Sequence, residues 1–253
     1  MKVVILAGGY GTRLAEYTEM IPKPMVTIGN RPIIWHIMNI YAKYGHTDFY
    51  IALGYKGEMI KNYFLNYKEL NTDFSIDLSS GKIKICSKDN TLNWNVTLVD
   101  TGEDTMTGGR LKKISKYVGN ETFLMTYGDG LANVNINKLI DFHNSKEKLV
   151  SLTSVRPNAR FGELEIKDSI VECFEEKPQL HKGWINGGFF VIDPKFIKYI
   201  KDDSTVLERE PLEKAVKDKE LAAYRHDGFW QCMDNKRDRE LLENLAISKN
   251  CPW

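Results

Sequence analysis

The sequence has few of the residues that build disulfide or zinc frameworks. Only four cysteines occur, Cys86, Cys173, Cys232 and Cys251, and they are widely separated with no C-x-x-C pair. The five histidines show no spacing typical of metal ligands. We therefore expect neither disulfide bonds nor a structural zinc site.

An excess of charge and long apolar runs are also absent. Lysine and arginine together number 35, against 34 aspartates and glutamates, so nothing indicates a nucleic-acid groove or a charged membrane-binding surface. No apolar run approaches the roughly 18 residues of a membrane helix, and residues 1–5 are too short for a signal-peptide core. These absences predict a cytoplasmic protein that binds neither nucleic acid nor membrane.

Short apolar runs alternate with amphipathic stretches over the first 155 residues. Such alternation favours an α/β fold whose mostly parallel sheet is covered by helices on both faces. Strands are expected at residues 2–6, 48–53, 121–127 and 148–155. Helices are expected at residues 32–44, where Pro32 suits a first turn and Gly45 a stop, and at 136–146.

The second half of the chain adds strands that lie closer together. Strands are expected at residues 161–166, 169–176 and 185–192, and helices at 206–217 and 236–247. No linker, repeat or low-complexity segment separates the halves. We therefore interpret residues 1–253 as a single domain with a part of mixed strands added to its α/β core.

A glycine-rich turn follows the first expected strand, in the segment LAGGYGTRL at residues 6–14. It is no P-loop, because no lysine–hydroxyl pair follows the glycines, and Leu14 replaces the third glycine of a dinucleotide fingerprint. With Arg13 and the later Lys23, the backbone N–H groups of this turn suit a polyphosphate. The alternative is a tight strand–helix turn with solvated charges.

The signature LAGGxGTRL…PKPM at residues 6–14 and 22–25 resembles that of the sugar-phosphate nucleotidyltransferases. Further blocks look like the branch that joins CTP to glucose 1-phosphate. They lie in unbroken order at residues 32–45, 53–64, 94–113, 126–130, 160–166, 176–190 and 229–238. The resemblance covers nearly the whole chain.

This resemblance implies a Rossmann-like nucleotidyltransferase fold and the reaction CTP + α-D-glucose 1-phosphate → CDP-glucose + pyrophosphate. It also implies Mg²⁺ as cofactor, a homo-oligomer, and a product used for the dideoxyhexoses of bacterial lipopolysaccharide. Residues 1–130 would bind the nucleotide and residues 131–253 the sugar phosphate. Because the attacking phosphate is already anionic, the reaction needs positioning and charge neutralisation, with no protein nucleophile.

The resemblance also assigns roles to residues. Arg13, Lys23 and Asp129 are the expected catalytic residues, and Asp129 with Asp234 would bind the metal. Asp129 ends a strand between two glycines, which leaves room for a hydrated ion. The expected nucleotide-binding residues are Leu6, Ala7, Gly8, Gly9, Tyr10, Gly11, Thr12, Arg13, Lys23, Thr105, Arg110 and Gly128. The expected sugar-phosphate-binding residues are Glu176, Lys177, Asn186 and Gly187, with the glycine leaving room for the sugar ring.

Residues 101–110 are interpreted as a loop that helps to select the cytosine base, and this loop favours CTP over UTP and dTTP. Ile21 stands where a basic residue is usual, Glu163 where a small one is usual, and Cys232 where proline is usual. These departures leave open the same reaction with UTP, dTTP or another sugar 1-phosphate. A nucleotide-binding regulatory protein without turnover is the alternative of another class.

Overall fold

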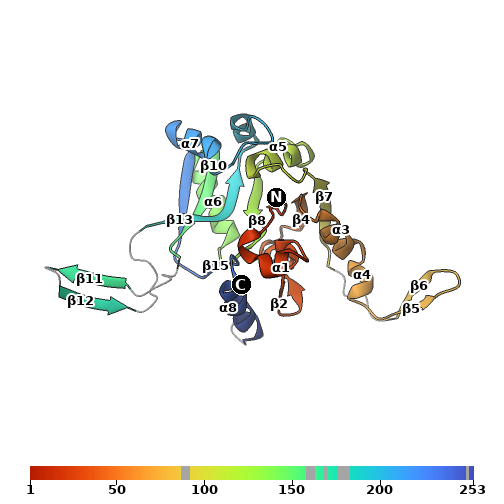
Figure 1. Ribbon diagram of the computed structural model, residues 1–253. Coiled ribbons are helices and arrows are strands. Elements are labelled where there is room, and N and C mark those ends of the chain that lie inside the picture. Colours follow the sequence, from red (N-terminus) through yellow and green to blue (C-terminus); the bar gives the residue numbers. More distant parts are fainter. Residues whose placement is uncertain (87–91, 158–162, 168–169, 176–182, 249–250) are drawn as a thin grey trace.

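A seven-stranded mixed sheet forms the centre of the protein (Figure 1). The computed structural model describes residues 1–86, 92–157, 163–167, 170–175, 183–248 and 251–253. The strand order is β14 (Leu221–His226), β10 (Val150–Val155), β13 (Ile185–Ile192), β8 (Phe123–Tyr127), β1 (Val3–Leu6), β4 (Asp48–Leu53) and β7 (Asn95–Asp100). Only β13 is antiparallel to its neighbours β8 and β10, so the expected mostly parallel sheet is confirmed.

Helices cover both faces of this sheet, as expected for buried parallel strands. Alternate residues of β1 point to opposite faces: Val3 and Ile5 pack with one buried cluster, Val4 and Leu6 with the other. The first face is covered by α2 (Ile33–Ala42), α3 (Gly57–Leu65), α6 (Ile136–Lys146) and α8 (Lys236–Ile247). The second is covered by α5 (Thr107–Val118), α7 (Glu210–Lys217) and the 3₁₀ helix η3 (Pro194–Tyr199).

Small ribbons extend this core. They are β2 (Thr27–Ile28) with β3 (Arg31–Pro32), β5 (Phe74–Asp77) with β6 (Lys82–Ile85), β9 (Gly130–Ala132) with β15 (Trp230–Cys232), and β11 (Glu163–Lys167) with β12 (Ile170–Glu175). The helices η1 (Thr12–Leu14), α1 (Ala15–Thr18), η2 (Lys23–Met25) and α4 (Tyr67–Leu70) are short. Figure 1 shows the β5–β6 ribbon standing away from the sheet beyond α4.

Most of the expected elements are found, with two corrections. The helix expected over 206–217 begins only at Glu210, because the N–H of Leu207 is bonded to the Thr107 hydroxyl oxygen outside any helix. The segment 101–110 is not a loop throughout, since α5 begins at Thr107. Its glycines permit close packing, because a Cβ on Gly109 would lie 2.6 Å from the Asp203 Cα.

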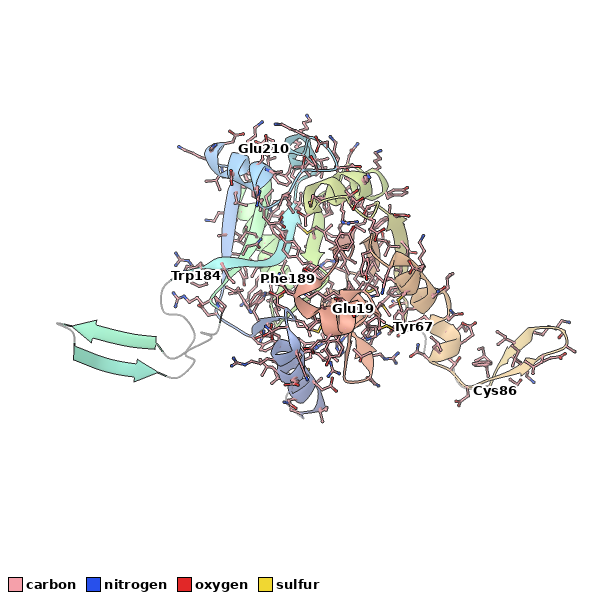
Figure 2. The ribbon with its side chains drawn as sticks, viewed as in Figure 1. Glu19, Tyr67, Cys86, Trp184, Phe189 and Glu210 are labelled. Carbon is pink, nitrogen blue, oxygen red and sulfur yellow. The ribbon has the colours of Figure 1, made fainter. Side chains whose placement is uncertain are left out.

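Figure 2 shows Phe189 within the body of the fold, between the two layers of helices. Its side chain is fully buried and stacks on Tyr41, with ring centroids 5.7 Å apart. Within the described part of the chain, no helix has the length and apolar character needed to cross a bilayer.

Candidate active site

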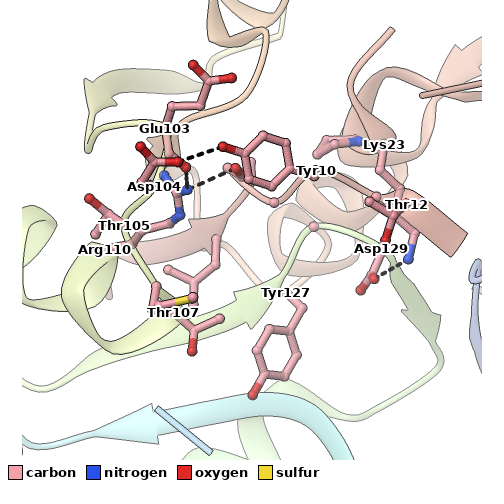
Figure 3. A pocket seen from close by; sticks show the side chains of 18 of the residues that line it. Tyr10, Thr12, Lys23, Glu103, Asp104, Thr105, Thr107, Arg110, Tyr127 and Asp129 are labelled. Carbon is pink, nitrogen blue, oxygen red and sulfur yellow. Dashed lines mark hydrogen bonds and ion pairs between the residues drawn. The ribbon is translucent and has the colours of Figure 1, made fainter. Parts of the chain in front are cut away.

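A cavity of about 550 Å³ opens at the carboxyl ends of β1 and β8 (Figure 3). Because six of the seven central strands run in the same direction, the segments that follow them gather at this edge. One wall is the glycine-rich turn and another is the start of α5. The cavity is lined by Leu6, Ala7, Gly8, Gly9, Tyr10, Gly11, Thr12, Arg13, Lys23, Pro24, Glu103, Asp104, Thr105, Met106, Thr107, Arg110, Tyr127, Gly128 and Asp129.

The three glycines of the turn have different reasons to be glycine. Gly8 packs against the Arg110 guanidinium, which leaves no space for a Cβ. Gly11 has φ +66°, and a Cβ there would lie 2.8 Å from Thr18. Gly9 has no atom within 4 Å of its Cβ position and no positive φ. The packing of the chain therefore gives no reason for glycine at position 9, whereas a ligand close to the backbone would.

The two predicted cations and the two predicted carboxylates form one cluster beside this cavity. The ammonium of Lys23 lies 2.6 Å from Asp129 Oδ2 and 2.8 Å from Asp234 Oδ1. The guanidinium of Arg13 lies 2.8 Å from Asp234 Oδ2. Figure 3 shows Lys23 and Asp129 together at one side of the cavity. The structure thus brings together residues that are more than 200 positions apart in the sequence.

The pairing of β9 with β15 explains how the two carboxylates meet. These strands place Gly130 opposite Cys232, so that Asp129, just before β9, and Asp234, two residues after β15, lie at the same end of the ribbon. The N–H of Met233 donates to the Asp129 carbonyl over 2.9 Å and holds the ribbon together at this point. The Asn235 side chain then caps α8 by accepting from the N–H of Asp238. Asp234 is therefore held between a ribbon and a capped helix.

The electrostatics of the cluster follow from burial and charge. Burial, the largest single effect, lowers the pKa of Lys23, but the charge of Asp129 and hydrogen bonds to Asp129 and Asp234 raise it, and that pKa lies at about 12. Burial raises the pKa of the Asp234 carboxyl, and hydrogen bonding and charge from Lys23, with the charge of Arg13, hold it below its usual value. At neutral pH the cluster therefore contains charged partners.

Cys232 lies in the same cluster, and the sequence analysis gave it no role. Its Sγ and carboxylate oxygens of Asp129 and Asp234 all lie within 4.8 Å of one another. Burial raises the pKa of the Cys232 thiol, so the sulfur faces the carboxylates as a neutral group. The two carboxylates are hard oxygen ligands of the kind that Mg²⁺ prefers.

Arg110 is buried and holds the walls of the cavity together. Its Nη2 donates to the carbonyls of Gly8 and Glu103, at 2.9 and 2.8 Å. Its Nη1 donates to the carbonyls of Leu53 and Gly102 and to the Thr101 hydroxyl, at 2.7 to 2.9 Å. Figure 3 shows it beneath Glu103 and Asp104. The residue predicted to contact the nucleotide is thus also a clamp between the glycine-rich turn and the segment before α5.

Thr105, the second residue predicted in this segment, is also buried. Its hydroxyl donates to the Thr101 carbonyl over 2.6 Å and lies 3.2 Å from the Lys113 ammonium. Above it, the Tyr10 hydroxyl donates to Asp104 Oδ1 over 2.8 Å and bridges the glycine-rich turn to the opposite wall. Gly128 fits tightly, since a Cβ there would lie 3.0 Å from the Leu6 carbonyl oxygen.

On the predicted sugar side, Asn186 lies on β13 and donates through Nδ2 to the Tyr127 hydroxyl over 3.2 Å. Gly187 is buried, and a Cβ there would lie 2.7 Å from Val155, so packing within the chain already requires this glycine. The room predicted for a sugar ring is therefore not needed to explain it. Glu176 and Lys177 lie outside the described residues, and their predicted roles stay predictions.

Two groups on this side were missed by the sequence analysis. Tyr127 ends β8 inside the cavity lining, and its hydroxyl donates to Glu208 Oε1 over 2.6 Å. Burial raises the pKa of Tyr127, and the carboxylate of Glu208 raises it further, so the phenol is protonated. The tyrosine looked like an ordinary strand residue, and the glutamate fell inside an expected helix.

The mixed sheet, with a glycine-rich turn and paired carboxylates at its carboxyl edge, agrees with the nucleotidyltransferase fold that the sequence motifs imply. The chain belongs to the Nucleotidyl transferase family, whose pattern matches residues 2–234. It is 48% identical to the glucose-1-phosphate cytidylyltransferase of Salmonella typhimurium over 254 residues, covering 100% of this chain and 98% of the relative. The enzyme of the same name from Salmonella typhi gives the same identity and coverage. Among solved structures, HddC from Yersinia pseudotuberculosis has a TM-score of 0.69 at 25% identity, covering 96% of this chain and 98% of that one.

Proposed function

We propose that this nucleotidyltransferase makes CDP-glucose and pyrophosphate from CTP and α-D-glucose 1-phosphate. The observation that carries the proposal is the cluster of Lys23, Arg13, Asp129 and Asp234 beside a cavity walled by the glycine-rich turn. The identity of 48% along the whole chain to enzymes named for this reaction supports the choice of substrates.

The chain's own residues would act by positioning and by neutralising charge. Two anions must approach each other when the sugar phosphate attacks the α-phosphorus, and charge then builds up on the departing pyrophosphate. The N–H groups around Gly9 would hold phosphate oxygens. The Arg13 side chain is 73% exposed, so its surface ion pair can be exchanged for a phosphate at little cost.

Lys23 has two tasks in this proposal. Its ammonium lies between the carboxylates of Asp129 and Asp234. When the triphosphate enters, the ammonium would turn toward the phosphate oxygens, where a mobile point charge is effective. The flanking Pro22 and Pro24 restrict the backbone and leave the movement to the side chain.

Asp129 and Asp234 would hold Mg²⁺ together with phosphate oxygens. The structure fits this ion, because the position between the carboxylates already accommodates a cation, the Lys23 ammonium. When bound, the metal supplies positive charge to the phosphate oxygens of nucleotide and pyrophosphate. The neutral thiol of Cys232 would be a neighbour of the ion, beside the two carboxylates.

Acceptor groups near the segment before α5 match cytosine better than uracil. Cytosine presents an amino donor where uracil presents a carbonyl acceptor, and the carboxylates of Glu103 and Asp104 line the cavity. A mismatched buried polar group costs roughly 1–3 kcal/mol, or about 10- to 150-fold in discrimination. Arg110 fixes the backbone of this wall by donating to the Gly8 and Glu103 carbonyls, so the segment that carries the two carboxylates is held before the base arrives.

On the sugar side, we propose that Lys177 binds the phosphate of glucose 1-phosphate and that Glu176, Asn186 and Gly187 contact the sugar. We also expect a homo-oligomer in the cytoplasm and a product that enters lipopolysaccharide synthesis. For these points the support is the resemblance of the sequence motifs.

A donor-by-acceptor screen with Mg²⁺ tests the proposal. Pyrophosphate release is measured for CTP, UTP, dTTP and GTP, each with glucose 1-phosphate, mannose 1-phosphate and galactose 1-phosphate. We expect the highest kcat/KM for CTP with glucose 1-phosphate. Comparable rates with all donors would remove the claim for cytosine, and binding of CTP without pyrophosphate release would favour the regulatory alternative.

A further inference from the structure

A series of hydrogen bonds leads from β13 to Tyr127, a residue that lines the cavity. The N–H of Gly188 donates to Asn186 Oδ1 over 2.9 Å, and Asn186 Nδ2 donates to the Tyr127 hydroxyl over 3.2 Å. The Tyr127 hydroxyl donates to Glu208 Oε1 over 2.6 Å. These hydrogen bonds therefore lead to the Glu208 carboxylate, which does not itself line the cavity.

The second oxygen of Glu208 joins this chain to the start of α5. Glu208 Oε2 accepts from the Thr107 hydroxyl over 2.7 Å, and the Thr107 oxygen accepts from the N–H of Leu207 over 2.9 Å. Thr107 and Tyr127 both line the cavity. The Glu208 carboxylate thus holds two side chains that line the cavity, Thr107 on α5 and Tyr127 on β8.

The carboxylate also fixes the direction of the chain, because it can only accept hydrogen bonds. The single proton of the Tyr127 hydroxyl is directed to Glu208, so the phenol oxygen acts as an acceptor, and it accepts from Asn186 Nδ2. The Asn186 amide is oriented by Gly188, which leaves its second N–H as a donor. A sugar hydroxyl, whose oxygen accepts hydrogen bonds, complements this N–H.

We propose that Glu208 is a positioning residue for the sugar: it holds Tyr127 as the acceptor that orients Asn186, and the second N–H of Asn186 donates to a sugar hydroxyl. This inference rests on the proposed function, and it makes Glu208 the residue that fixes the orientation of the sugar-binding side chains. The hydrogen bond to a charged acceptor is of the strong kind, so its loss should be measurable.

Glu208→Gln tests the inference, because the amide has the shape of the carboxylate but can donate a proton toward Tyr127. We expect the KM for glucose 1-phosphate to rise about tenfold, with the KM for CTP within about twofold of wild type. Tyr127→Phe should give the same pattern. The double variant should be no worse than the poorer single variant, because both changes break one chain.

Glu210→Gln is the matched control, since Glu210 is exposed on α7 and pairs with Lys201 (Figure 2). Its kinetic constants should match wild type. Equal increases in both KM values, unchanged KM values, or additive effects in the double variant would overturn the inference. If wild type itself forms no CDP-glucose, the proposed function fails first, and isothermal titration of Glu208→Gln with glucose 1-phosphate alone then decides whether Glu208 sets sugar binding.

Discussion

At the scale of single residues, Lys23 is the side chain that links the two carboxylates of the site. Its buried ammonium compensates two carboxylates at once, and breaking such a pair leaves uncompensated charge. We expect Lys23→Met to lose at least about 100-fold in turnover. We also expect it to bind Mg²⁺ more tightly than wild type without nucleotide, because the competing cation is gone.

Calorimetric titration with MgCl₂, and melting temperatures with and without the ion, measure this effect. Mg²⁺ should raise the melting temperature of Lys23→Met more than that of wild type. Lys116→Met, on the exposed face of α5, is the control for loss of one lysine. Equal metal affinity in the variant and wild type would contradict the prediction.

Gly9 offers a second test at this scale, because a substitution there should change ligand affinity without changing the stability of the fold. Gly9→Ala should leave the free energy of unfolding within about 0.5 kcal/mol of wild type, since its Cβ meets no atom. Its affinity for CTP, measured by titration, should fall at least about tenfold. Gly8→Ala should instead unfold more easily, because its Cβ meets Arg110. A Gly9→Ala protein with normal CTP affinity would remove the turn from phosphate binding.

At the scale of elements, α2 is linked to the last residues of the chain by one histidine. His36 Nε2 donates to the Ile28 carbonyl over 2.9 Å, and its Nδ1 accepts from the Trp253 indole N–H over 3.2 Å. Burial lowers the pKa of His36 below its usual 6.5, so folding favours the neutral ring. This histidine therefore contributes stability that is complete above pH 6.5 and is lost as pH falls through the lowered pKa.

Urea unfolding of wild type and His36→Gln at pH 7.5 and pH 5.5 checks this expectation. The free energy of unfolding of wild type should fall more toward the acid side than that of the variant. His226→Gln serves as the control, because His226 contacts the Phe229 carbonyl and not Trp253. The same pH dependence in wild type and His36→Gln would contradict a role for the histidine.

At the scale of the whole molecule, the sheet is continuous across the two parts proposed to bind the nucleotide and the sugar phosphate, residues 1–130 and 131–253. Strand β13 pairs with β8 through Phe190–Met125, Val191–Leu124 and Ile192–Phe123, and all six side chains are fully buried. If either part unfolded alone, it would expose a fully buried strand of the other part to water. We therefore expect one cooperative unfolding transition, with circular dichroism and tryptophan fluorescence changing at the same urea concentration.

Phe190→Ala should lower the stability by about 3–5 kcal/mol and move both signals together. Two separate transitions, or a shift in one signal alone, would show that the two parts unfold independently.

The sequence predicted those parts of the fold whose signal is local. The helices at 136–146 and 236–247 are amphipathic, the strand at 185–192 ends in an apolar run, and the bounds of all three match the structure. The antiparallel direction of β13 has no such local signal. The start of α5 was missed because its two glycines look like a loop, and only packing against Asp203 and Thr205 explains them.

The residues of the site also differ in whether the sequence alone could predict them. The glycine-rich turn, Lys23 and Asp129 stand out in the sequence, whereas Asp234 was found only through resemblance. Glu208 gives no signal, because a glutamate in an acidic, exposed segment usually lies on a solvated surface. Its partners Thr107 and Tyr127 are 101 and 81 residues away, and only the folded chain brings them together.

The distance between Lys23 and Asp234 along the chain has a consequence for synthesis on the ribosome. The partner carboxylate of Lys23 and Arg13, on Asp234, is synthesised 211 residues after Lys23 and 221 residues after Arg13. A polypeptide released early would lack the ribbon that carries Asp234, so an abortive translation product would not complete this charge cluster.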